Sequence, residues 1–142
     1  MEFNTKFITR CLAVCFLILS GTISRGQEKE VTKMQQVMAQ HDEVMDEMPK
    51  LSKLINQLQT KANASYKKEK YENAISDLKL ANKSMMSWMA NFGKRFEADE
   101  MMKGKELTEK KKRWLLEEEK KVALLKEEIE LSISQAERVL GN

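Results

Sequence analysis

The sequence has few residues that break secondary structure. In 142 residues proline occurs once, at Pro49, and glycine five times, while aromatic residues make up only 6%. So few turn formers argue against a fold of many short strands, because such strands are bounded by Gly, Pro, Asn and Asp. Charged residues reach 33%, and Glu, Lys, Leu and Met are abundant, which favours long helices. The length suits one domain.

Residues that carry catalysis are equally scarce. His41 is the only histidine, and both cysteines, Cys11 and Cys15, lie near the N-terminus. There is no glycine-rich phosphate loop, and carboxylate pairs one turn apart, such as Asp42 and Asp46, are common on Glu-rich helices. A hydrolase or transferase needs a nucleophile, a base and stabilising donors that converge on one point. We therefore predict that the protein is not an enzyme.

The N-terminal segment has the order of a signal peptide. Two basic residues precede an apolar run over residues 11–19, and small and polar residues follow it. The run is too short to cross roughly 30 Å of hydrocarbon as a helix. We predict a signal peptide over residues 1–26, with cleavage after Gly26 favoured over cleavage after Ser24. The mature chain is then exported to the periplasm or the extracellular space.

Both cysteines fall within this removable segment. Lipidation at Cys15 would leave the apolar residues 16–19 on the mature chain, which disfavours a lipid anchor. The rest, residues 27–142, has no cysteine for disulfides and no apolar run long enough for a transmembrane helix. Its charge is close to neutral, and glutamates follow the basic run at residues 110–113 one turn later. We therefore predict no binding to nucleic acid.

Apolar residues recur at helical spacing through the mature chain. Two series with a seven-residue repeat interleave in its first part: Met34, His41, Met48 and Ile55, and Val37, Val44, Leu51 and Leu58. A second stripe, flanked by Ile75 and Met89, comprises Tyr71, Ala74, Leu78, Ala81, Met85, Trp88 and Phe92. A third runs from Leu107 to Val139. We predict an all-α fold, an up-down-up bundle of three long helices over about residues 28–66, 71–92 and 105–140.

The breaks between the helices follow from the residues that interrupt the stripes. Pro49 removes one backbone hydrogen bond, but the apolar register continues beyond it, which predicts a kink rather than an end. Residues 63–70 are polar and without register, which places the first reversal there. Gly93 is the expected left-handed cap of the second helix. An irregular connection is then expected as far as Gly104.

A short segment resembles a tetratricopeptide repeat. The match runs from Ala62 through Tyr66 and Tyr71-Glu-Asn-Ala-Ile75 to Leu78 and Ala81. It covers about 30 residues and no second copy follows, whereas a repeat fold needs about three units. The match therefore indicates a helical hairpin only.

A wider resemblance covers nearly the whole mature chain. It rests on His41-Asp-Glu-Val-Met45, on Met85-Met-Ser-Trp-Met-Ala-Asn-Phe92, and on Leu107-Thr-Glu109 with Leu116-Glu-Glu-Glu-Lys120. These motifs resemble a family of small envelope proteins of Bacteroidetes that often carry the name "viral A-type inclusion protein". The resemblance implies a location in a Gram-negative envelope and no assigned activity. Members are often lipoproteins, whereas this chain lacks the lipidation motif.

His41 raises a question because it occupies a core position of the first stripe. One interpretation is a structural histidine whose ring N–H bonds a backbone carbonyl or a side chain of another helix. Another is a soft-metal site in which Met38, His41 and Met45 offer two thioethers and an imidazole to Cu(I) or Ag(I). Further ligands or contacts on the second helix would be Met85, Trp88 and Met89. A third is an adaptable, Met-rich binding face. Core packing without a cofactor is the interpretation we favour.

Together these patterns favour a non-catalytic, exported helical bundle of the cell envelope. We expect it to bind or scaffold another macromolecule, either an envelope protein or a second copy of itself. The alternative is a periplasmic protein that binds Cu(I) or Ag(I).

Overall fold

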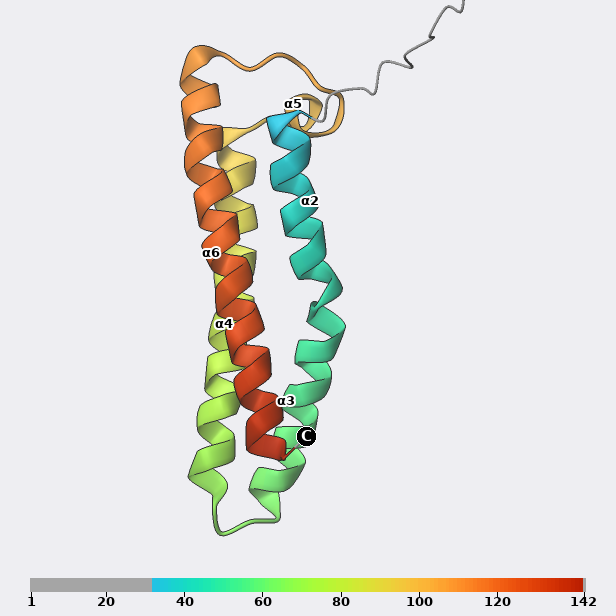
Figure 1. Cartoon of the computed structure of the whole chain (residues 1–142), viewed down its shortest axis with the longest axis vertical. Coiled ribbons are helices and arrows are strands. Elements are labelled where there is room, and N and C mark those ends of the chain that lie inside the picture. Colours follow the sequence, from blue (N-terminus) through green and yellow to red (C-terminus); the bar gives the residue numbers. More distant parts are fainter. Residues whose placement is uncertain (1–31, 142) are drawn as a thin grey trace, which may run out of the picture. The chain divides into compact units, whose positions relative to one another are not determined.

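A computed structural model describes residues 32–141, and every regular element in this part of the chain is a helix. The helices are α2 (Lys33–Asp46), α3 (Met48–Asn63), α4 (Lys68–Arg95), α5 (Ala98–Met102) and α6 (Glu109–Leu140). The all-α class is therefore confirmed, whereas the signal peptide predicted over residues 1–26 lies outside the described residues. α2 and α3 descend in line, α4 returns, and α6 descends again beside it (Figure 1). None of the described helices is long and apolar enough to cross a membrane.

Side-chain caps decide where the long helices begin. The Thr32 hydroxyl accepts a hydrogen bond from the Gln35 N–H at 3.2 Å, and the Gln35 side chain accepts one from the Thr32 N–H at 2.8 Å. This capping box starts α2 directly after Thr32, and the predicted helical residues 28–31 lie outside the described residues. Thr108 likewise caps α6 by accepting from the Lys111 N–H at 3.3 Å, which moves that start past the predicted residue 105.

The first predicted helix consists of two helices that meet at Glu47. Glu47 keeps a right-handed helical backbone, with φ −82° and ψ −14°, and its N–H donates to the Val44 carbonyl at 3.1 Å. The Leu51 N–H then donates to the Glu47 carbonyl at 3.0 Å, so α-helical bonding resumes within one turn. Pro49 lies in the first turn of α3, where its missing N–H costs nothing. The chain changes direction here without a loop (Figure 1).

Gly93 does not end the second helix, which corrects the prediction. α4 continues to Arg95, and the left-handed backbone falls on Gly104 instead, with φ 70°. The extra turn brings Phe96 onto the core face next to Phe92, with ring centroids 4.7 Å apart. Both rings are buried, and burial of an aromatic side chain outweighs the roughly 1 kcal/mol that a glycine costs inside a helix. A short helix, α5, follows where the sequence predicts irregular structure.

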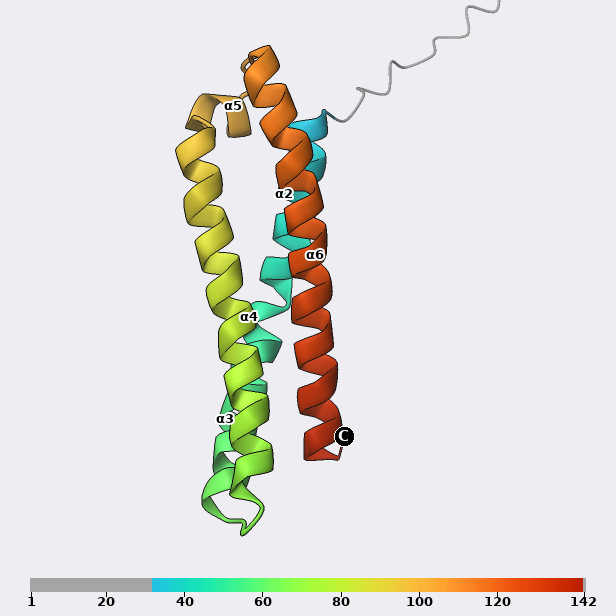
Figure 2. The same cartoon turned by 90° about the vertical axis from the view of Figure 1, so that its left-hand side faces the viewer.

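The buried side chains of α4 are small in one half of the bundle and large in the other. Small residues such as Ala74 and Ala81 let α3 approach α4 closely in one half of the bundle. In the other half the larger Trp88 and Phe92 fill the space, and α2 packs mainly on α6 and α5. α5 bridges the ends of α4 and α6 at this wider end (Figure 2).

The residues predicted to form the core do so to different extents. Six are buried: Met34, Val37, Val44, Met85, Trp88 and Phe92. Met48 and Met89 are partly buried and pack against the core.

Candidate functional site

The residues of the predicted metal site differ in how deeply they are buried. The His41 side chain is 13% exposed, and its ring stacks on Trp88 of α4 with the centroids 5.7 Å apart. Met38 is partly buried against the core, whereas Met45 is 40% exposed. His41 thus packs against α4, Met38 packs against the core, and Met45 lies at the exposed edge of the stripe. Trp88 of α4 provides the ring contact with His41.

The hydrogen-bond partner of His41 differs from the expected one. His41 Nδ1 lies 3.0 Å from Oδ1 of Asp42, the next residue of the same helix. Nδ1 thus has a partner on its own helix, and α4 contributes the face of the Trp88 ring to this contact. The Trp88 indole Nε1 is itself buried and has no acceptor among residues 32–141. Ring stacking therefore links α2 to α4 here.

The contact continues as a row of aromatic rings along α4. Trp88 and Phe92 have ring centroids 4.9 Å apart, and Phe92 is followed by Phe96. Tilted contacts at these distances stabilise by about 0.5–1.5 kcal/mol each beyond the area they bury. The row leads from His41 to the end of the bundle that carries α5.

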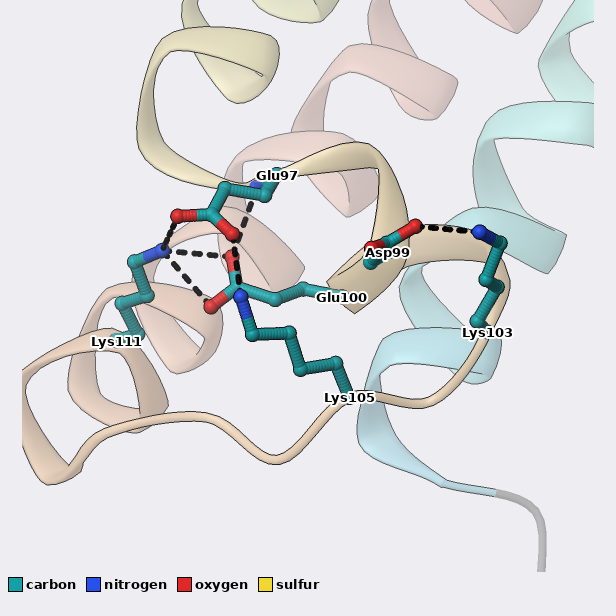
Figure 3. Close-up of polar contacts among 6 residues, drawn as sticks. All are labelled: Glu97, Asp99, Glu100, Lys103, Lys105 and Lys111. Atoms are coloured by element: carbon teal, nitrogen blue, oxygen red, sulfur yellow. Dashed lines mark hydrogen bonds and ion pairs between the residues drawn. The ribbon is translucent and has the colours of Figure 1, made fainter.

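A buried carboxylate at that end was missed by the sequence analysis. Glu100 of α5 is 4% exposed, and its oxygens accept hydrogen bonds from Lys111 Nζ at 2.7 and 2.8 Å. The Glu97 N–H donates to Glu100 as well, at 2.8 Å (Figure 3). Burial alone would raise the pKa of the Glu100 carboxyl, but the Lys111 and Glu97 bonds outweigh it and lower that pKa below its ordinary value.

Further ion pairs fasten the chain between α5 and α6. Lys105 Nζ lies 2.6 Å from a Glu97 oxygen, and Lys103 Nζ lies 2.8 Å from an Asp99 oxygen (Figure 3). The Lys105 N–H also donates to the Asp99 carbonyl at 3.2 Å. These exposed pairs are individually weak. Together with the buried Glu100, they hold the segment between α5 and α6 in one conformation.

A second buried carboxylate, Glu118, lies on α6 about two turns after Lys111. The Glu118 side chain is 2% exposed and pairs with Arg95 at 3.0 Å and Lys121 at 2.8 Å. The Arg95 guanidinium also lies over the Trp114 ring, 5.2 Å from its centroid. Arg95 thus ties the last turn of α4 to α6.

An open cavity of about 420 Å³, which we call the end pocket, lies beside Glu100. It lies between the start of α2, α5, residues 103–108 and the first turns of α6. Its apolar lining consists of Met34, Leu107, Leu115 and Leu116, and its charged lining consists of Lys33, Lys105 and Lys112 with Glu100 and Glu106. The volume falls within the range of small-ligand sites. No local pattern could have revealed it, because its lining comes from separate segments.

No family model, curated protein or solved structure matches this chain. What the protein does is therefore inferred from the end pocket, the His41–Trp88 contact and the surface of the bundle.

Proposed function

We propose that the protein is a non-catalytic helical bundle of the cell envelope that binds another macromolecule through the end pocket. The observation that carries this proposal is an apolar cavity with lysines at its edge. Met34 and the neighbouring leucines suit an apolar anchor side chain, since methionine adapts to irregular partners. The lysines suit acidic groups that flank such an anchor. The partner we propose is a protein segment with an apolar residue between acidic ones.

The lysines are able to exchange partners. Lys33 pairs with Glu119 at 2.7 Å, Lys112 with Glu109 at 2.8 Å, and Lys105 with Glu97. All three lysine side chains are more than a third exposed, so their present pairs are screened by water. Acidic groups of a partner can therefore replace these glutamates at little cost in free energy.

The hydrogen bonds of Glu100 support a structural role in the wall of the end pocket. A general acid or base at neutral pH needs a pKa near 7, whereas the pKa of Glu100 is lowered. Its oxygens are already engaged by Lys111 and the Glu97 N–H. We propose that this carboxylate holds the wall of the pocket in place.

Affinity capture from the native envelope tests the proposal. The processed protein and its Leu107→Asp variant serve as baits, and Leu80→Asp on α4, where Leu80 is 60% exposed, is the matched control. Circular dichroism melts verify that each bait is folded. A partner retained by the wild type and Leu80→Asp, but lost with Leu107→Asp, supports the end pocket. Capture that is equal on all three baits, or no partner at all, refutes it.

A second candidate function is periplasmic binding of Cu(I) or Ag(I). It is favoured by the stack of His41 on Trp88, with Met38 and Met89 partly buried against the same core. Imidazole and thioether donors suit these soft ions. Saturation at 100 times the dissociation constant stabilises a fold by about 2.7 kcal/mol, so copper should raise the melting temperature of the wild type but not of His41→Ala. An unchanged wild-type melt in saturating Cu(I) eliminates this function.

A further inference from the structure

The outward face of α6 carries large apolar side chains where solvated groups are expected. Leu116, Leu124 and Leu131 are 51%, 66% and 67% exposed. At 100° per residue the three fall within an arc of about 80°, on the side opposite the buried residues Val122 and Ile129. The outward face of a surface helix is normally polar. Leu116 also lines the end pocket, so this apolar face begins at the edge of the pocket and continues along α6 through Leu124 and Leu131.

The spacing of this face is self-complementary. Suppose that two copies of α6 lie antiparallel, with a twofold axis between residues 123 and 124. Leu116 then faces Leu131 of the second copy, and Leu124 faces Ala123 at the centre. Lys120 faces Glu127 of the second copy, between the leucine layers. Apolar residues thus face apolar residues, and Lys120 of each copy faces Glu127 of the other.

The charges select the antiparallel arrangement over the parallel one. In a parallel pair Lys120 would face Lys120 and Glu127 would face Glu127, which is unfavourable. Both side chains are exposed and neither forms an ion pair within residues 32–141, so both are available to a second copy. In the same antiparallel register Glu109 faces Arg138 at either end of the interface. The charge pattern thus complements itself at these two pairs of positions on α6.

We propose that the protein forms a homodimer through this face of α6, with antiparallel helices and a twofold axis beside Leu124. Such an interface is isologous, so it closes after two copies. Residues 109–138 span about 44 Å, and the buried area is that of a small interface, which implies a weak, concentration-dependent dimer. The two end pockets would lie at opposite ends of the dimer, and Leu131 of the second copy would cover Leu116. Because Leu116 also lines the end pocket, the dimer would cover one edge of each pocket.

Analytical ultracentrifugation of the processed protein tests the dimer. The wild type should change from monomer to dimer between low-micromolar and near-millimolar concentration. Leu124→Glu should raise the dissociation constant at least tenfold, whereas Leu80→Glu on α4 should leave it unchanged. A wild type that stays monomeric, or equal effects of the two substitutions, overturns the proposal.

A charge reversal tests the register. Lys120→Glu alone and Glu127→Lys alone should each weaken the dimer, because each places like charges opposite one another. The double variant should regain most of the lost affinity, since residue 120 of one copy meets residue 127 of the other. A double variant as weak as the singles overturns the antiparallel register.

Cysteine cross-linking provides an independent geometric test, because residues 27–142 contain no cysteine. A mixture of Leu116→Cys and Leu131→Cys chains should form a mixed disulfide, while neither chain should couple efficiently to itself. Self-coupling of Leu116→Cys would show a parallel pair and overturn the proposal. If Leu107→Asp abolishes capture of an envelope partner but leaves the dimer intact, the pocket and the dimer are separate properties.

Discussion

Replacement of Lys111 by methionine should destabilise the fold more than replacement of its partner Glu100 by glutamine. Lys111→Met removes the ammonium but leaves a carboxylate that is 4% exposed and retains only the Glu97 N–H as a donor. Glu100→Gln removes the charge and keeps an oxygen that can accept from both donors. Lys111 is then left 20% exposed, with a Glu97 oxygen already 3.8 Å away.

The magnitudes follow from the position of the pair at the end of the bundle. Breaking a deeply buried ion pair costs about 3–5 kcal/mol, whereas exposed pairs contribute about 0–1 kcal/mol. Because water reaches Lys111, we expect a loss of about 2 kcal/mol for Lys111→Met and about 1 kcal/mol for Glu100→Gln. The double variant should be less destabilised than the sum of the singles, since no unpaired buried charge remains. Urea unfolding followed by circular dichroism measures all three.

The pH dependence of stability shows whether the buried Glu100 carboxylate causes the loss in Lys111→Met. In the wild type the pKa of Glu100 is lowered, so its contribution is present above the ordinary carboxyl pKa and is lost as pH falls through the lower value. Without Lys111, burial raises the pKa of Glu100, and protonation relieves the penalty as pH falls. The stability difference between wild type and Lys111→Met should therefore narrow from neutral pH to about pH 4. Lys112→Met removes the partner that lowers the pKa of Glu109, but water screens this exposed pair, so its stability difference should change much less with pH. A larger loss for Glu100→Gln, or a difference that does not narrow, refutes the reasoning.

Three other predictions concern the first helix pair and the N-terminus. Pro49→Ala should lower stability by about 0.5–1 kcal/mol, because the proline fits the first turn of α3 and restricts the unfolded chain. A clear gain in stability on urea unfolding would show that the kink is strained. His41→Ala should lower the free energy of unfolding by about 1–3 kcal/mol through loss of the contact with Trp88. His41→Leu should recover part of that loss. An unchanged melting temperature for His41→Ala would contradict the structural role of His41. Mass spectrometry of the exported protein should find an N-terminus at Gln27 or Arg25, and an intact signal segment would disprove cleavage.

The all-α class could be predicted because its signals are local. Apolar residues spaced three and four apart specify helices and the faces they bury, and the polar residues 63–70 specify the first reversal, which the structure places between Asn63 and Lys68. The effect of Gly93 could not be predicted in this way. A glycine favours a helix end by its backbone freedom, but the packing of Phe96 against Phe92 decided that α4 continues.

The candidate sites show the same division. The sequence by itself determined that His41, Met38 and Met45 share one side of a helix, because that depends only on spacing. Only the tertiary structure decided that His41 meets Trp88 while Met45 stays exposed, because this depends on where α4 lies. The burial of Glu100 and the end pocket likewise arise where α2, α5 and α6 meet. Helical periodicity is a property of neighbouring residues, whereas a cavity and a buried ion pair exist only once distant segments have been brought together.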